Sequence, residues 1–337
     1  MAAPPPVDPV AFTRRLVDIE STSGSEAAVG GVLVEELRAR GYHVEQQPVS
    51  ADRFNVFART HEPPVVVFST HIDCVPPFFP SREADGRLYG RGACDAKGIV
   101  AAQIAAADAL RAQGEHRIGL LYVVGEERGS DGAREANRHA PPGVRYLIDG
   151  EPTDSRLGLG TRGVLRMRLS APGVAAHSAY PELGDSAINK LLDALAAIRG
   201  LEFPVNELFG TTHFSIGLIQ GGVASNVIAP HATAELVFRT VSDGYPEIDA
   251  VTRVAGGVAV ETLLNIPAVR LLTLDGFDTA TFSFGTDIPL LTNWGTPLLF
   301  GPGSIHRAHT SEEFVDIAEL RAAVGHYVAL AGRLLVR

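Results

Sequence analysis

Val65-Val66-Val67-Phe68-Ser69-Thr70-His71-Ile72-Asp73 joins a continuous apolar run to a histidine and an acid. A short run of this kind predicts a strand that is buried on both faces. Open α/β sheets build their sites at the carboxyl ends of such strands. Because side chains alternate along a strand, His71 and Asp73 are expected on the same side. The stretch therefore predicts an α/β fold with a candidate site at this strand end.

Two more apolar runs, Ile118 to Val124 and Tyr146 to Ile148, predict further buried strands. The Ala-rich segment from Ile99 to Arg111 predicts a crossover helix between the first two strands. This βαβ order indicates a mixed, largely parallel sheet flanked by helices. Buried strands are also expected at Leu290 to Leu291 and at Pro297 to Phe300.

Capping residues predict where several helices begin. Asp8 followed by Pro9 predicts a first helix, and Ser25 is expected to cap a second. Asp316, with Glu319 in the capping-box position, predicts a long final helix.

The pattern changes after about residue 160, where Leu165, Met167 and Leu169 alternate with arginines, as in a strand with one wet face. A helix capped by Asp185 and three more strands follow, which indicates a small α+β module. We predict a catalytic domain of residues 1–160 and 269–337 and an inserted domain of residues 161–268.

The composition of the 337 residues limits the function classes. A hydrophobic fraction of 45% is typical of a globular chain, and the formal net charge of −10 excludes a whole-chain basic field for nucleic acid or an anionic membrane. Only two cysteines occur, and the N-terminal residues lack the features of a signal peptide. We expect a soluble cytoplasmic protein without a nucleic-acid or membrane partner.

Three further positions carry acids where apolar or glycine-rich segments end. Asp95 follows a glycine-rich loop just before the crossover helix, where an N-cap is the alternative role. Glu126 and Glu127 follow the second strand, and adjacent acids at a buried strand end repel unless a cation or a shared proton intervenes. Glu151 follows the third strand, where Asp149 is a competing candidate.

Six motifs together resemble the family of di-zinc aminoacylases, acetylornithine deacetylases, succinyl-diaminopimelate desuccinylases and glutamate carboxypeptidases. The resemblance spans most of the chain and implies a catalytic α/β domain with an inserted, ferredoxin-like dimerisation domain. The motifs are His71-x-Asp73, Gly90-Arg91-Gly92-Ala93-Cys94-Asp95-Ala96-Lys97-Gly98, Gly125-Glu126-Glu127, Gly150-Glu151-Pro152-Thr153, Ala176-His177-Ser178-Ala179-x-Pro181 and Ala308-His309-Thr310-Ser311-Glu312-Glu313-Phe314.

The resemblance implies two Zn²⁺ ions per subunit, for which Co²⁺ or Mn²⁺ are possible substitutes. It implies that His71, Asp95 and Glu151 hold one ion, and that Asp95, Glu127 and His309 hold the other. Histidine nitrogens and carboxylate oxygens are ligands of catalytic zinc, and this set leaves a position for water. His306 is the competing histidine, but Glu313-Phe314-Val315 follows His309 at the spacing of the family.

By the same resemblance, Glu126 is the general base and Asp73 orients His71. In the inserted domain, His177 would reach the active site of the partner in a homodimer and donate to the oxyanion. Asn226 and Arg239 would bind the substrate carboxylate, for which a guanidinium is chemically suited.

The resulting hypothesis is a metal-dependent deacylase that cleaves the amide bond of an N-acyl amino acid. A carboxypeptidase or dipeptidase of the same family, acting on short peptides, is the first alternative. A non-catalytic binding protein on the same scaffold is the alternative of another class.

Overall fold

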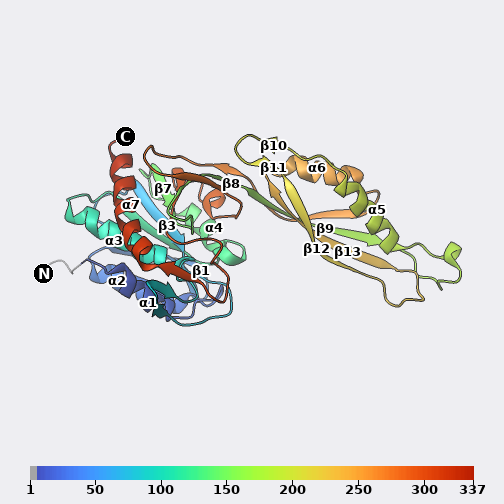
Figure 1. Cartoon of the computed structure of the whole chain (residues 1–337), viewed down its shortest axis with the longest axis horizontal. Helices are drawn as coiled ribbons and strands as arrows, with labels where there is room; N and C mark the ends of the chain where they lie inside the picture. The colour runs from blue at the N-terminus through green and yellow to red at the C-terminus, as the bar shows by residue number, and fades with distance from the viewer. Residues whose placement is uncertain (1–5) are drawn as a thin grey trace. The chain divides into compact units, whose positions relative to one another are not determined.

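The computed structural model describes residues 6–337, which form two compact units (Figure 1). The first unit contains the chain up to Leu159 together with Leu271–Ala280 and Thr286–Arg337. The second contains Gly160–Arg270 and Thr281–Gly285. The chain thus leaves the first unit at Gly160 and returns to it at Leu271, and the short segment Thr281–Gly285 belongs again to the second unit.

The first unit is built on a six-stranded sheet in the order β1-β2-β6-β3-β7-β17. Strands β6, β3, β7 and β17 run parallel, while β1 and β2 form an antiparallel edge beside β6. The predicted mixed, largely parallel sheet is therefore confirmed. The strands are β1 (His43–Ser50), β2 (Arg53–Arg59), β3 (Val66–His71), β6 (Ile118–Val123), β7 (Tyr146–Asp149) and β17 (Thr296–Leu299).

Helices cover both faces of this sheet, which explains the continuous apolar runs. Val66 and Phe68 of β3 pack into a core with α1, α2, α3 and α7, whereas Val67 between them packs with α4 on the opposite face. Burial on both faces leaves only the strand ends for polar groups. The helices are α1 (Pro9–Val17), α2 (Ala27–Ala39), α3 (Lys97–Ala112), α4 (Asp131–Arg138) and α7 (Ile317–Leu335).

A small sheet in the first unit has the order β18-β5-β4. Its strands are β4 (Arg82–Ala84), β5 (Arg87–Tyr89) and β18 (Phe314–Asp316). Because β5 and β18 are antiparallel partners, the loop that follows β5 lies beside the loop that precedes β18. These two loops carry residues of the candidate site.

The second unit contains a four-stranded sheet in the order β12-β13-β9-β14, with every pair antiparallel. Helices α5 (Ala187–Arg199) and α6 (Tyr245–Val254) pack with the apolar face of this sheet. The helix α6 was not predicted, because it has only 10 residues and Val251 is its one fully buried apolar residue. The strands are β9 (Gly163–Pro172), β12 (His213–Gly221), β13 (His231–Thr240) and β14 (Ala259–Ile266).

Shorter elements complete the fold. They are the pair β10 (Val205–Asn206) and β11 (Gly210–Thr211), the sheet β15-β8-β16 formed by β8 (Leu157–Thr161), β15 (Val269–Arg270) and β16 (Thr279–Phe282), and the 3-10 turns η1 (Glu126–Arg128), η2 (Pro181–Leu183) and η3 (Ile288–Leu290). Among the helices of residues 6–337, none combines the length and the apolar character needed to cross a membrane.

Two capping predictions were wrong. Glu26 rather than Ser25 precedes α2, and its side chain makes no capping hydrogen bond. Ser186 rather than Asp185 caps α5, because its Oγ accepts the hydrogen bond from Asn189 N while Asp185 pairs with Lys190. In each case a neighbouring residue occupies the cap position, so the error is one residue.

The capping box predicted at the start of α7 does not form. Asp316 precedes the helix, but its side chain makes no capping bond and instead pairs with Arg87 at 3.2 Å. Glu319 accepts hydrogen bonds from Ser155 Oγ at 2.8 Å and from Gly303 N at 3.0 Å. The predicted strand at Leu290 to Leu291 was also wrong, since Leu290 ends the 3-10 turn η3. Tertiary partners override these local signals.

Candidate metal centre

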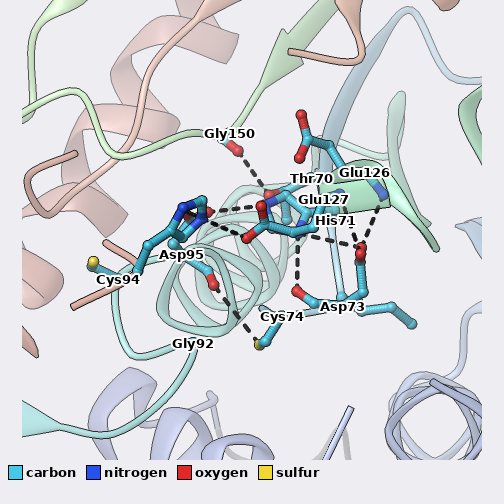
Figure 2. Close-up of polar contacts among 12 residues, drawn as sticks. Thr70, His71, Asp73, Cys74, Gly92, Cys94, Asp95, Glu126, Glu127 and Gly150 are labelled. Atoms are coloured by element: carbon cyan, nitrogen blue, oxygen red, sulfur yellow. Dashed lines mark hydrogen bonds and ion pairs between the residues drawn. The ribbon is translucent and has the colours of Figure 1, made fainter. Parts of the chain in front are cut away.

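His71, Asp95 and Glu127 converge in the first unit although they come from three separate segments (Figure 2). His71 ends β3, Asp95 lies in the loop before α3, and Glu127 lies in η1 after β6. One ligand atom from each lies within 4.8 Å of the others. Parallel strands direct their carboxyl ends to one edge of a sheet, so this edge collects polar side chains from distant parts of the chain.

Asp95 lies between two histidines. Its Oδ1 is 2.9 Å from His71 Nε2, and its Oδ2 is 3.3 Å from His309 Nε2. His309 Nε2 also lies 2.8 Å from Glu127 Oε1. The competing His306 is exposed and, among the described residues, forms no hydrogen bond or ion pair with these acids. The structure thus places His309, and not His306, against the acids.

The acids create a strongly negative potential at His309. Hydrogen bonds to Asp95 and Glu127 raise the pKa of His309 to about 10. Burial opposes ionisation of Asp95, but hydrogen bonds from both histidines hold the pKa of Asp95 below its usual range. A position that favours a protonated imidazole to this degree also favours a divalent cation.

Glu126 and Glu151 form no ion pair with a positive side chain among the described residues. Burial, reinforced by neighbouring acids, raises the pKa of each carboxyl well above its usual value. Among the described residues, the Glu126 side chain accepts no hydrogen bond and forms no ion pair, and it is partly exposed to solvent. Its carboxylate is therefore free to take up a proton from a bound molecule.

The Asp73 carboxylate links the end of β3 to the turn that follows β6. It accepts hydrogen bonds from Ser23 Oγ at 2.6 Å, from Glu126 N at 3.1 Å and from Glu127 N at 3.2 Å. Asp73 Oδ1 also lies 3.5 Å from His71 Nδ1. One buried carboxylate thus orients the histidine and holds the turn that carries both glutamates, as Figure 2 shows.

The remaining alternatives at Asp95 and Asp149 have different surroundings. Ala96 rather than Asp95 occupies the N-cap position of α3, so the capping alternative does not describe Asp95. Asp149 lies within β7 and accepts a hydrogen bond from Ser69 Oγ of β3. Its carboxylate is therefore engaged between the strands, while Glu151 lies past the strand end.

Sequence reasoning missed one acid of the cluster. Asp287 is 2% exposed, burial raises its pKa to about 7, and its charge contributes to the raised pKa of Glu126. It follows a glycine and a threonine in a segment without a strand or helix signal, so no periodic pattern marks it. Only its depth in the folded unit identifies it.

The donor set fits divalent metal ions. It combines imidazole nitrogens with carboxylate oxygens, which suit zinc and related ions. Several acids share a desolvated space, where their mutual repulsion is offset if cations bind between them. The residues are therefore suited to a metal centre on the chemistry of the site alone.

The residues predicted in the inserted domain lie in the second unit. The backbone of His177 forms an antiparallel bridge with Val227, and Ser178 N donates to Asn226 O at 3.0 Å. His177 and Asn226 therefore share one exposed loop region. Arg239 lies near the far end of β13, where it is half-buried and its side chain forms no hydrogen bond or ion pair among the described residues.

Comparison with known proteins agrees with the α/β fold and the candidate metal centre described above. Residues 67–333 match the profile of the peptidase family M20/M25/M40. A probable carboxypeptidase of Aspergillus clavatus is 37% identical over 374 aligned residues, which cover 97% of this chain and 83% of the relative. A crystal structure of a tripeptidase from Staphylococcus aureus has a TM-score of 0.80 at 22% identity and covers 96% of this chain and 98% of that one.

A third relative is a Bacillus subtilis protein described as a dinuclear metal binding peptidase from the M20 family. Its TM-score is 0.72 at 18% identity, and the match covers 97% of each chain. The protein is thus a metallopeptidase-type hydrolase that acts on amide bonds. The chain belongs to peptidase family M20/M25/M40.

Proposed function

We propose that this protein hydrolyses an amide bond whose amine half carries a free carboxylate. The observation that carries the proposal is the unpaired Glu126 carboxylate beside the group formed by His71, Asp95 and Glu127. Both a peptide with a free C-terminus and an N-acyl amino acid meet this description. The name of the Aspergillus clavatus relative favours the carboxypeptidase form, and the deacylase form differs only in the acyl half of the substrate.

We assign His71, Asp95 and Glu151 to one divalent ion and Asp95, Glu127 and His309 to a second. Zinc is the ion we propose, with Co²⁺ or Mn²⁺ as substitutes, because the set mixes nitrogen and oxygen donors. When bound, such ions polarise the scissile carbonyl and acidify the attacking water. Asp95 contacts both histidines in the structure, which supports a shared role for its two oxygens.

Glu126 performs the proton transfers in this proposal. Its carboxylate takes a proton from the attacking water and delivers it to the nitrogen of the departing amine. Burial that raises its pKa brings its proton affinity closer to the working range of a general base. Asp73 supports this step by holding Glu126 N, which orients the turn.

Three residues of the second unit are proposed to act on the substrate. Arg239 and Asn226 would bind its carboxylate, and His177 would donate to the oxyanion. The half-buried guanidinium of Arg239 forms no hydrogen bond or ion pair among the described residues, which supports a role in binding an anion. However, β13 separates Arg239 from the loop of His177 by eight residues or more, roughly 26 Å of extended strand. One small substrate cannot contact both residues of the same unit.

This separation supports the proposal of a homodimer in which His177 and the neighbouring Asn226 serve the site of the partner subunit. The edge strand β12 offers a surface for such an assembly, because Ile216, Leu218 and Ile219 are 39%, 55% and 54% exposed. An edge strand has no neighbouring strand on its outer side, and exposed apolar side chains on such a strand favour association.

The decisive test of the hydrolase is the Glu126→Gln variant. We expect kcat to fall by about 10²- to 10⁴-fold while the metal content stays at the wild-type level, because the change removes only the proton acceptor. Glu312→Gln is the matched control, since Glu312 is an exposed acid with 73% of its side chain accessible. Full activity of Glu126→Gln contradicts the mechanism, and metal binding without any hydrolysis by the wild type points to the binding-protein alternative.

A substrate panel separates the two forms of the reaction. It contains dipeptides, longer peptides with free or amidated C-termini, N-acetyl amino acids and N-succinyl-diaminopimelate. We expect amidated peptides to be poor substrates, because they lack the carboxylate that Arg239 would bind. Equal turnover of free and amidated peptides contradicts the proposed recognition of the carboxylate.

The homodimer can be tested by mixing two inactive variants. His177→Ala and Glu126→Gln subunits each lack one function, but a mixed dimer joins an intact Glu126 with the partner's intact His177. If subunits exchange freely at equal amounts, about a quarter of wild-type activity should return. Light scattering measures the oligomeric state directly, and a monomeric, active protein overturns this part of the proposal.

A further inference from the structure

Glu313 is a buried acid for which the proposed reaction has no use. Its side chain is 1% exposed, although it lies only four residues from His309. Oxygen Oε2 accepts a hydrogen bond from Arg91 Nη1 at 2.6 Å. Oxygen Oε1 accepts three hydrogen bonds from main-chain amides of one loop, Gly92 N at 2.9 Å, Asp95 N at 3.2 Å and Cys94 N at 3.3 Å.

The backbone explains why Glu313 reaches this loop. Phe314 of β18 pairs with Tyr89 of β5, and Gly90 N donates to Glu313 O at 3.1 Å. The antiparallel ladder therefore ends with Glu313 facing the turn that leads to Asp95. Burial and three amide donors hold this carboxylate in one place.

The segment from His309 to Glu313 holds Asp95 from two sides. At one end, His309 Nε2 lies 3.3 Å from the Asp95 carboxylate. At the other end, the Glu313 carboxylate receives the main-chain N–H of the same aspartate. One short segment thus contacts both the side chain and the main chain of Asp95.

We propose that Glu313 is a positioning residue that preorganises Asp95 and His309 for metal binding. This inference rests on the proposed metal centre but goes beyond its ligand set. Groups that orient metal ligands contribute about 10- to 100-fold to metal affinity. Without the hydrogen bonds to Glu313, the loop that contains Asp95 would have to become ordered when the metal binds, and this ordering lowers the metal affinity.

A single Glu313→Gln change is a poor test because of the Arg91 side chain. Glutamine offers one acceptor and one donor group, so either its amide nitrogen faces Arg91 Nη1 or it faces the three main-chain donors. The test therefore uses two double variants that remove the buried ion pair equally. Arg91→Met with Glu313→Gln keeps an acceptor for the loop, and Arg91→Met with Glu313→Met removes it.

The experiment titrates the metal-free forms of both double variants with Co²⁺ and records affinity and visible spectrum. We expect the variant with Gln to bind within about threefold of the wild type and to keep its spectrum, and the variant with Met to bind at least about tenfold more weakly with shifted bands. Hydrogen exchange of the metal-free proteins should be faster at Gly92, Cys94 and Asp95 only in the variant with Met. Glu312→Gln, a change in the exposed neighbour, should behave as the wild type.

Equal Co²⁺ affinities, spectra and exchange rates in the two double variants overturn the proposed role of Glu313. A lower melting temperature of the variant with Met, with unchanged metal affinity, overturns it as well, because the role is then only structural. Failure of the wild type to bind Co²⁺ removes the metal centre itself and the inference with it. The two failures are therefore distinguished by the wild-type titration.

Discussion

Glu126 in the first unit and Glu235 in the second are carboxylates whose pKa values are shifted in opposite directions. Glu126 follows a strand buried on both faces, has no positive partner among the described residues, and has a pKa raised by burial. Glu235 lies on the wet face of β13, accepts from Arg168 Nη2 at 2.9 Å, and this hydrogen bond lowers its pKa. A parallel sheet covered on both faces concentrates desolvated acids at its edge, whereas a sheet with one open face pairs them in water.

The largest effect is expected from the acid shared by two histidines. We expect Asp95→Asn to lower activity by about a thousandfold or more and to reduce the bound metal, because the amide cannot supply a negative ligand to either position. Elemental analysis and steady-state kinetics measure both effects. Asp185→Asn, which changes a surface acid paired with Lys190 in the second unit, is the control. Full metal content in Asp95→Asn would contradict the role of Asp95 as a metal ligand.

Asp287 tests the cost of burying an acid near the centre. Its pKa is about 7 in the folded chain, against an ordinary value of 3.8, so the folded state holds the proton more tightly than the unfolded state. Stability of the metal-free wild type should therefore fall as the pH rises from about 4 to 7, by a few kcal/mol at most.

The Asp287→Asn variant should lose that dependence. Above pH 7 we expect the metal-free variant to be more stable than the wild type. Near pH 4 the two should be similar, because this pH is close to the unfolded-state pKa of Asp287 and most of the stability difference develops above it. Chemical denaturation at pH 4, 6 and 8 provides the measurement. Parallel pH profiles for the two proteins would show that Asp287 is not the group responsible.

Arg239 tests whether the second unit contributes chemistry or only a scaffold. We expect Arg239→Met to lower kcat/KM by about 10- to 100-fold, because a charged hydrogen bond to the substrate is lost. Metal content should be unchanged. Arg166→Met is the matched control, since Arg166 lies on β9 and pairs with Glu235 at 3.4 Å. An equal loss in both variants would indicate damage to the sheet and not loss of binding.

The smallest effect is expected at Glu235. Exposed ion pairs contribute little to stability, so Glu235→Gln should leave the melting temperature within about 2 °C of the wild type and leave activity unchanged. Calorimetry and the standard assay provide the two measurements. A large loss of either would mean that the open face of the second unit is covered in the native assembly.

Sequence patterns predicted the elements that depend on local composition. The apolar runs predicted β3, β6 and β7, and the Ala-rich segment predicted α3. Elements that are buried on both faces consist of consecutive apolar residues, which the sequence shows directly. The caps of α2 and α5 were each predicted one residue early, since several polar residues near a helix start can compete for one role. The start of α7 at Asp316 was predicted, but its capping box does not form. The helix α6 was not predicted, because it is short and buries only one apolar side chain, Val251.

For the candidate site as well, some features were predicted from the sequence and others were identified only in the structure. The sequence by itself determined which side chains stand at the strand ends, because each follows an apolar run or a glycine-rich loop that can be read locally. Only the tertiary structure decided that Asp95 lies between His71 and His309, that Glu313 clamps the loop of Asp95, and that Asp287 is buried beside Glu126. These contacts join segments far apart in the chain, and their electrostatics depend on loss of water, which no local pattern records.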